Sequence, residues 1–234
     1  MSYYIFMLPA ILIMMATQSY VKSAYRKWSQ VPNQRNMTGA EAAQRLIRAA
    51  GIGRLDSGEG TGGGLRIEQI GGSLTDHYDP RAKVLRLSPG VAQGKSVASL
   101  AIAAHELGHA QQDAEEYFPL RLRGALVPAV NIGSSLGWIL ILAGLFLQIT
   151  NLSYLGLVIF SLGAVFALAT LPVEFDASAR AKRMLADTGI ITSEQERRGV
   201  NNVLNAAALT YVAALVTAVM QVLYYSSLVR GRRR

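Results

Sequence analysis

The sequence has no cysteine and only three histidines among its 234 residues. Without cysteine the chain can form no disulfide and offers no thiolate ligand, so a metal site would have to use His, Asp or Glu side chains. The lack of cysteine does not by itself identify a cellular compartment. Charge is also missing from four long segments, which are residues 3–21, 125–149, 152–171 and 206–229.

Each uncharged segment approaches or exceeds the roughly 20 residues that a helix needs to cross a bilayer. The fold class predicted is therefore a mainly α membrane protein with a four-helix transmembrane bundle. The first segment differs from a signal peptide because no basic residues precede it, no small-residue cleavage pattern follows it, and Lys22, Arg26 and Lys27 come next. The predicted organisation is an anchor at 1–21, a polar segment at 22–124, a membrane hairpin at 125–171, a second polar segment at 172–205, and a last span with a basic tail at 206–234.

The formal net charge of +8 is explained by basic residues that flank the apolar segments. Such residues set membrane topology and face anionic headgroups, so nucleic acid is not expected as a partner. With four spans, both polar segments lie on one side, and the positive-inside rule favours the cytoplasm. The tail RGRRR conflicts with this topology. Either the tail lies outside, or the last segment does not fully cross.

The first polar segment shows local signals of a folded scaffold. Thr38–Glu41 has the pattern of a capping box, and the helix that follows is expected to end at Gly51. The glycine-rich stretch 57–64 matches no phosphate-binding loop and is predicted to be a flexible loop. Short strands are predicted around 65–70 and 83–87, which would form a small β-sheet.

A helix is predicted from about Ser96, with no proline before Pro119, and it contains the stretch AHELGHAQQD. His105 and His109 lie four residues apart, so one helix face presents both rings to one ion at about 2 Å. Glu106 is rotated by about 100° from His105, and its carboxylate could hold a metal-bound water without binding the metal. This is the HExxH pattern. The plainer alternative is a helix with two hydrogen-bonded histidines, because short patterns recur by chance.

A catalytic zinc requires three protein ligands, and the candidates for the third are His77 and the carboxylates. Glu174 follows the third apolar segment, and the hairpin 125–171 would return the chain to the HExxH helix. Pro172 is expected to start a helix with Glu174 in its first turn, and Asp176 is expected to point elsewhere. A glutamate at a membrane boundary needs a partner, and zinc is the best one available. His77 remains the first alternative.

His77 and Tyr78 are candidates for a second catalytic role, because a His or Tyr often stabilises the oxyanion in zinc peptidases. A turn histidine held by a neighbouring aspartate is the equally weighted alternative. Substrate is expected to lie extended along a strand edge formed by 74–78 or 83–87. Gly108, between the two histidines of the motif, would permit close approach of another backbone or of substrate.

Seven stretches, in order along nearly the whole chain, resemble the YugP-like family of bacterial membrane-bound zinc metallopeptidases. They are TGAEAAQRLI, GGSLTDHYDP, LRLSPGV, AAHELGHAQQ, LVPAVNIGS, LPVEFDASARA and VLNAAALTYVAA. The wider HtpX-type peptidases carry HExxH followed by a Glu-x-x-x-Asp helix. Glu174 matches that glutamate, whereas Ser178 stands where those relatives have aspartate. The glycine-rich stretch looks like a local insertion.

The resemblance implies peptidase activity but gives no substrate, and Glu174 matches its glutamate ligand. The function predicted is a membrane-embedded, gluzincin-like zinc endopeptidase with one Zn²⁺ per chain on His105, His109 and Glu174, and with Glu106 as the base. A site at the membrane face favours membrane or membrane-proximal proteins as substrates, and His77 and Tyr78 stay candidates for an assisting role. The expected location is the bacterial plasma membrane, with the active site on the cytoplasmic face. The expected partners are a protein or peptide substrate and the lipid bilayer, and a homo-oligomer is left open.

Two other functions could use the same histidines, namely an inactive zinc-binding scaffold and a metal transporter. A catalytically inactive zinc-binding scaffold would tolerate loss of Glu106, yet Glu106 is present. A metal transporter would need the HExxH helix to cross the membrane. Its apolar run is too short, because Lys95 precedes it and Gln111 and Gln112 follow it directly.

Overall fold

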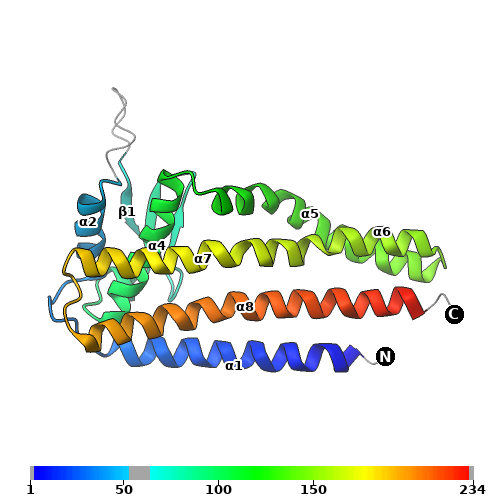
Figure 1. Cartoon of the computed structure of the whole chain (residues 1–234), viewed down its shortest axis with the longest axis horizontal. Coiled ribbons are helices and arrows are strands. Elements are labelled where there is room, and N and C mark those ends of the chain that lie inside the picture. Colours follow the sequence, from blue (N-terminus) through cyan, green and yellow to red (C-terminus); the bar gives the residue numbers. More distant parts are fainter. Residues whose placement is uncertain (1–2, 53–63, 232–234) are drawn as a thin grey trace. The chain divides into compact units, whose positions relative to one another are not determined.

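The computed structural model describes residues 3–52 and 64–231, and most of the glycine-rich stretch 57–64 therefore lies outside the described residues. Within these ranges the chain forms eight helices and three short strands (Figure 1). The described chain divides into two compact units. The apolar unit comprises Met1–Ser19, Phe118–Pro172 and Leu209–Arg234, and the polar unit comprises Tyr20–Tyr117 and Val173–Ala208.

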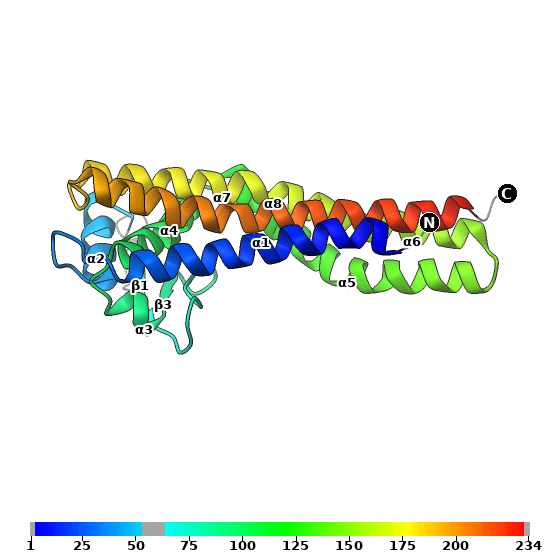
Figure 2. The ribbon, with the colours of Figure 1, turned by 90° about the horizontal axis from the view of Figure 1, so that it is seen from below.

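Four helical stretches are long and apolar enough to cross a membrane, as predicted. They are α1 (Tyr3–Ser29), α5 (Phe118–Phe146), α6 with α7 (Thr150–Asp187) and α8 (Glu194–Gly231). In Figures 1 and 2, α1 and α8 can be followed as long blue and orange-to-red helices. The prediction of four spans is confirmed by length and composition.

Two predicted boundaries in the hairpin are wrong. The uncharged segments 125–149 and 152–171 predict a turn at Thr150–Asn151, but the turn lies at 147–149. Gln148 reverses the chain with a positive φ of 60°, and the Ile149 N–H donates to Gly144 O. Residues from Thr150 already belong to α6 (Thr150–Phe160). Pro172 does not start a helix but lies inside α7 (Leu162–Asp187). Proline is tolerated within membrane helices, where other groups satisfy the carbonyl that it leaves unpaired.

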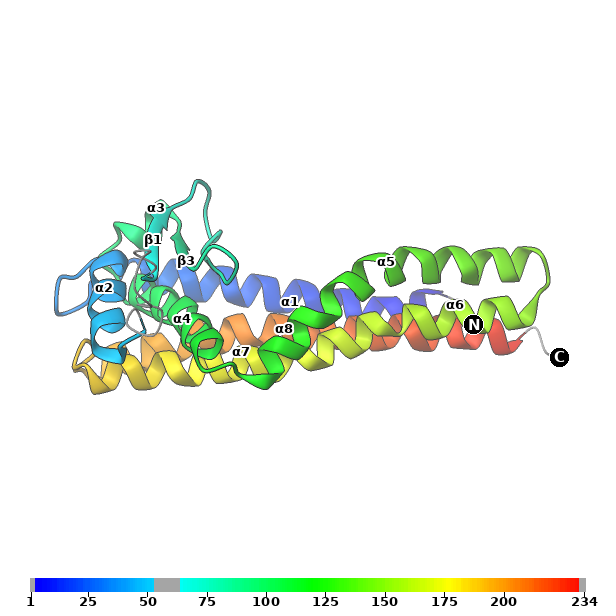
Figure 3. The same ribbon diagram turned by 90° about the horizontal axis from the view of Figure 1, so that it is seen from above.

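Figure 3 shows α5 and α6 side by side and joined by a short turn. Glycines bring the backbones of these two helices into contact. A Cβ on Gly137 would lie 2.6 Å from Phe160 N and 2.9 Å from Gly156 O. A Cβ on Gly156 would lie 2.5 Å from Ile141 N. In lipid, where apolar burial between helices supplies little driving force, such close packing is what holds helices together.

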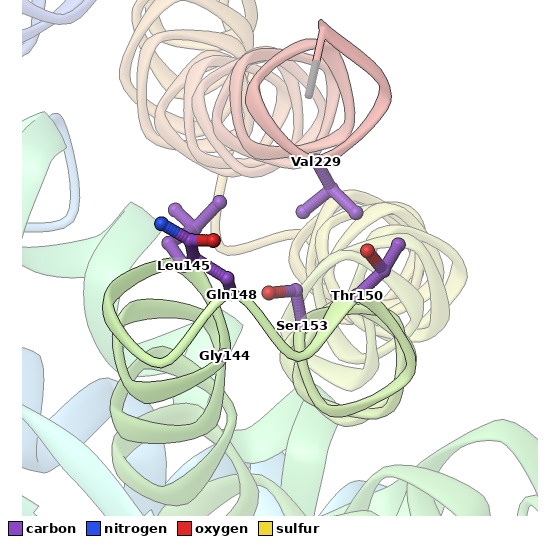
Figure 4. A pocket seen from close by; sticks show the side chains of 6 residues that line it. All are labelled: Gly144, Leu145, Gln148, Thr150, Ser153 and Val229. Atoms are coloured by element: carbon purple, nitrogen blue, oxygen red, sulfur yellow. The ribbon is translucent and has the colours of Figure 1, made fainter. Parts of the chain in front are cut away.

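The turn end of this hairpin contains a pocket of about 340 Å³ (Figure 4). Its lining consists of Gly144, Leu145, Gln148, Thr150, Ser153 and Val229. The Ser153 hydroxyl also contacts the backbone oxygen of Ile141 at 3.4 Å. The pocket lies within the apolar unit and its lining includes no titratable side chain. It therefore offers neither a metal ligand nor a catalytic base.

In the polar unit, α2 (Gly39–Ala50) begins and ends as the sequence predicts. The Thr38 hydroxyl accepts from Glu41 N–H at 3.1 Å, and the Glu41 carboxylate accepts from Thr38 N–H at 2.8 Å. Both hydrogen bonds of the capping box are therefore present. Gly51 ends the helix with a φ of 66°, in the left-handed region that suits glycine.

The small sheet has three strands rather than the two predicted. They are β1 (Arg66–Gln69), β2 (His77–Asp79) and β3 (Val84–Leu87), in the order β1-β3-β2. β3 pairs parallel with β1 and antiparallel with β2. The suggestion that 83–87 forms an edge is wrong, because β3 is paired on both sides. β2 was not among the two predicted strands, although the suggested edge stretch 74–78 overlaps it, because three residues are too few to show an alternating pattern.

The core of the polar unit surrounds α4 (Val97–Ala114), the helix that carries the HExxH motif. The side chains of Leu100 and Leu107 are fully buried, together with Leu46 of α2, Leu85 of β3 and Leu185 of α7. Alanines occupy much of the remaining buried surface of α4, so that neighbouring elements approach closely. Burial on several sides holds this helix rigidly within the unit.

The glycine contacts in the hairpin predict opposite effects for two matched substitutions on α5. Gly137→Ala should lower the free energy of unfolding by about 1–3 kcal/mol, because its methyl group meets backbone atoms that cannot turn aside. Gly124→Ala, where nothing lies within 4 Å of the added Cβ, should raise it by up to about 1 kcal/mol through helix propensity. Thermal unfolding in detergent, followed by circular dichroism, measures both. Equal stabilisation by the two substitutions would contradict the hairpin contact.

Candidate metal centre

His105 and His109 on α4 lie against Glu174 on α7, and all three belong to the polar unit. One possible ligand atom from each residue can be chosen so that all lie within 4.8 Å of one another. The Nε2 atoms of His105 and His109 lie 3.3 and 3.5 Å from Glu174 Oε2. The Glu174 side chain is only 4% exposed. The structure thus brings together the three predicted ligands, although Glu174 comes from the interior of α7 rather than from a first turn.

Gly108 is the reason that the two helices can come so close. A Cβ on this residue would lie 2.5 Å from Ala177 O and 3.0 Å from Ala177 Cα. The backbones of α4 and α7 therefore touch at this point, between the residues that carry the ligand atoms. The expected close approach at Gly108 is to another backbone.

Each histidine uses its second ring nitrogen to contact a polar side chain. His105 Nδ1 lies 3.2 Å from Ser178 Oγ, and His109 Nδ1 lies 3.0 Å from Gln112 Oε1. Such contacts orient the ring of a metal-binding histidine. Ser178 thus contacts a histidine from the position where related peptidases have aspartate.

Gln112 was not recognised in the sequence, although its place three residues after His109 puts it on the same helix face. Its Nε2 group donates to Val173 O at 2.8 Å and to Asp176 Oδ2 at 2.9 Å. Asp176 therefore contacts no candidate ligand directly, as expected. It is nevertheless linked to His109 through Gln112.

The chemistry of the three facing atoms fits a divalent cation. Imidazoles with no hydrogen on Nε2 and an ionised carboxylate would present only lone pairs to one another at these positions, and such groups repel unless a cation or a proton lies between them. Two imidazole nitrogens with one carboxylate oxygen are a ligand set found in catalytic zinc sites. The residues present therefore fit zinc.

Glu106 lies next to His105 on α4, and its carboxylate faces the sheet. Its Oε2 accepts a hydrogen bond from the backbone N–H of Tyr78 in β2 at 3.1 Å. Burial raises the pKa of the Glu106 carboxyl above its ordinary value, and the positive charge that His105 and His109 can carry opposes the rise. A carboxyl with a raised pKa is suited to accepting and returning a proton near neutral pH.

His77 and Tyr78 are neighbours in β2, so their side chains leave the sheet on opposite faces. Tyr78 packs against the core, and its hydroxyl donates to Asp113 on α4 at 2.5 Å. The His77 ring instead lies 2.8 Å from the backbone oxygen of Thr75. Among the described residues, the metal-type cluster includes His105, His109 and Glu174 but not His77. The catalytic roles suggested for His77 and Tyr78 stay predictions.

Comparison with known proteins extends the argument from the site to the whole chain. Residues 3–230 match the sequence profile of a family described as "Putative neutral zinc metallopeptidase". The chain belongs to this family. The match spans both units and includes every residue of the cluster, and it confirms the family resemblance inferred from the seven stretches.

A curated relative of this zinc metallopeptidase family supports a membrane setting. The chain is 42% identical over 208 residues to "Putative membrane protease YugP" of Bacillus subtilis (strain 168), covering 89% of this chain and 88% of the relative. No solved structure matches the chain. Together with the four apolar helices, the relative supports membrane association of this family member.

Glu174 is expected to contribute more to metal binding than its helix neighbour Asp176. Glu174→Ala removes one of the three clustered ligand atoms, so purified protein should lose most of its zinc. Asp176→Ala removes an acceptor of hydrogen bonds from Gln112 and Arg180 but no clustered ligand atom, so zinc content should fall less. Elemental analysis of both variants, purified in parallel with wild type, measures the difference. The reverse order would mean that the ligand set is wrong.

The helix contact at Gly108 predicts a loss of zinc without removal of any ligand. In Gly108→Ala, the new methyl group should push α7 away from α4 and separate Glu174 from the histidines. An outer-shell disturbance of this kind costs roughly 10- to 100-fold in zinc affinity. Gly163→Ala on α7 is the matched control, because nothing lies within 4 Å of its added Cβ. Zinc titration with a competing chelator compares the two. Unchanged affinity in Gly108→Ala would show that the contact does not hold the ligands together.

Proposed function

We propose that this family member is a membrane-embedded zinc endopeptidase of the HExxH, gluzincin-like type that hydrolyses peptide bonds of membrane or membrane-proximal proteins. The observation that carries the proposal is the pairing of two groups of residues on α4. His105 and His109 meet Glu174 of α7 on one side. Glu106, between the histidines in sequence, meets the backbone of β2. A metal-binding group and a buried carboxylate thus lie next to each other, as metal-assisted hydrolysis requires.

His105, His109 and Glu174 would hold one zinc ion per chain. When bound, zinc supplies a Lewis acid that polarises a carbonyl oxygen and lowers the pKa of water. Ser178 and Gln112 orient the two imidazole rings from behind. The short contacts of these five side chains leave their geometry little freedom, which favours a preorganised site.

Glu106 would act as the general base and then as the general acid. Its carboxylate takes a proton from the water that attacks the scissile carbonyl, and it later gives that proton to the leaving amine. The hydrogen bond from Tyr78 N–H fixes one carboxylate oxygen and leaves the other to face the reacting water. The raised pKa of the carboxyl makes the Glu106 carboxylate a stronger base for taking the first proton.

Substrate would lie extended along β2, the edge strand next to Glu106. The Tyr78 N–H donates to Glu106 rather than to β3, so the unpaired edge of β2 faces the side of α4 that carries Glu106. Main-chain hydrogen bonds to an edge strand read little of the substrate sequence. Cleavage should therefore depend more on an extended substrate than on particular side chains.

The plasma membrane of a bacterium is the proposed location, with the reaction on the cytoplasmic face. Lys and Arg residues flank the apolar segments on the side shared by the two polar segments, and the positive-inside rule assigns such a side to the cytoplasm. The related protein from Bacillus subtilis carries the words "membrane protease" in its name. Both observations favour cleavage close to the bilayer.

The rival functions make different predictions from the same residues. The transporter hypothesis needs α4 to cross the membrane, but α4 has 18 residues and is not among the four candidate spans of the described chain. An inactive zinc-binding scaffold would have the same cluster without a use for Glu106. Loss of Glu106 therefore separates the scaffold from the enzyme.

Glu106→Gln should keep zinc bound and abolish peptide cleavage. The amide preserves the size of the side chain but cannot accept the proton, and loss of a general base lowers turnover by about 10²- to 10⁴-fold. Cleavage of an unfolded membrane-protein substrate, measured beside zinc content, tests both halves of the expectation. Full activity in a clean Glu106→Gln preparation would contradict the mechanism. If the variant is inactive, comparative proteomics of membranes with wild-type and Glu106→Gln protein identifies the substrates.

A further inference from the structure

Gln112 is a fully buried amide that the proposed reaction does not consume or contact. It lies one turn beyond His109 on α4, with 0% of its surface exposed. A buried amide is costly unless its donors and acceptor find partners. Gln112 contacts His109 Nδ1 at 3.0 Å, Val173 O at 2.8 Å and Asp176 Oδ2 at 2.9 Å.

The partners of Gln112 determine which way its amide faces. Val173 O is a backbone carbonyl and Asp176 is a carboxylate, so both can only accept hydrogen bonds. They must face the NH₂ group of Gln112, since the reversed amide would set its oxygen against two other oxygens. The amide oxygen is therefore left to face His109 Nδ1. Because that oxygen can only accept, His109 Nδ1 must carry the hydrogen.

This hydrogen-bond order has a direct consequence for the other nitrogen of His109. A neutral imidazole carries one hydrogen, so a hydrogen on Nδ1 leaves a lone pair on Nε2. Nε2 is the atom that lies 3.5 Å from Glu174 Oε2 in the cluster. Metal binding requires that atom to be free of hydrogen.

We propose that Gln112 is a positioning residue that holds His109 in the Nδ1-protonated tautomer and so keeps Nε2 available as a metal ligand. The identity of the ligand rests on the proposed zinc function. The tautomer itself is a property of this chain that can be measured without metal and without substrate.

A chain of ionic contacts on α7 holds Gln112 in this orientation. Arg180 Nε donates to the same Asp176 oxygen at 2.5 Å, and another nitrogen of Arg180 donates to Glu115 at 2.6 Å. The Arg180 guanidinium also lies 5.6 Å from the centre of the Tyr117 ring. Asp176 is thus fixed as an acceptor for Gln112, and it acts on His109 only through Gln112.

His105 provides a comparison within the same site. Its Nδ1 contacts the hydroxyl of Ser178, which can donate or accept a hydrogen bond. Ser178 therefore does not decide the tautomer of His105 as Gln112 decides that of His109. The two ligands should differ in how strictly their protons are placed.

The chain suits a nitrogen-15 NMR test, because it contains only three histidines. Full-length protein with labelled histidine is studied in lipid nanodiscs, metal-free, at a pH high enough for the His109 ring to be neutral. Burial lowers the pKa of His109, but contact with Glu174 outweighs it and leaves this pKa above its ordinary value. Single histidine substitutions assign the signals. The wild-type His109 ring should show hydrogen on Nδ1 alone. Gln112→Met, which keeps the volume of the side chain and removes its hydrogen bonds, should give a mixture of tautomers and roughly 10- to 100-fold weaker zinc binding.

A further variant separates this role from simple packing. Ser178→Ala changes the contact of the other histidine and should leave the His109 signals unchanged. Hydrogen on Nε2 of metal-free wild-type His109 would overturn the inference, whether or not any variant folds. The wild-type tautomer in the expected form, beside full cleavage by Glu106→Gln, would support the inference and reject the catalytic proposal alone.

Discussion

The candidate site depends on one contact between two backbones, at Gly108 of α4 and Ala177 of α7. Glu174 lies three residues before Ala177, and Ser178 lies four residues after Glu174, so Glu174 and Ser178 share the face of α7 that contacts His105. A single close approach therefore brings the carboxylate to both histidine rings and the hydroxyl to the back of His105. Any side chain larger than hydrogen at 108 would move all of these groups together. The distances within the cluster are therefore set by how closely α4 and α7 pack at Gly108 and Ala177.

The helix α4 presents the candidate metal ligands on one side and the candidate base on another. Towards α7 it presents His105 and His109 to Glu174. Towards the sheet it presents Glu106, whose carboxylate is held by the backbone N–H of Tyr78. Asp113, two turns further along, receives the hydroxyl of the same tyrosine. Tyr78 thus ties the edge strand to α4 at two points, so that the base and the strand on which substrate would lie keep a constant spacing.

Several features were predictable because they are written into short, contiguous stretches. The capping box at Thr38 and the left-handed end at Gly51 need only neighbours in sequence, and both are present. The spacing of His105 and His109 follows from the helical repeat. The strand β2 was anticipated only as one of two possible edge stretches, at 74–78, because its pairing with β3, rather than its own three residues, makes it a strand. The role of Gln112 escaped prediction for the same kind of reason, since two of its partners come from α7.

Composition, length and the helical repeat were enough to predict the four apolar helices and the helix that carries the HExxH motif with its two histidines, and seven short stretches were enough to indicate the family. Each of these features is written in contiguous chain, whereas the third candidate ligand was left open between Glu174 and His77. The three-dimensional contacts were needed to place Glu174, from the middle of α7, beside both histidines, to make β2 the edge facing Glu106, and to place Gln112 and Ser178 at the second ring nitrogens. Such contacts join residues far apart along the chain, and their distances depend on how closely two backbones can pack.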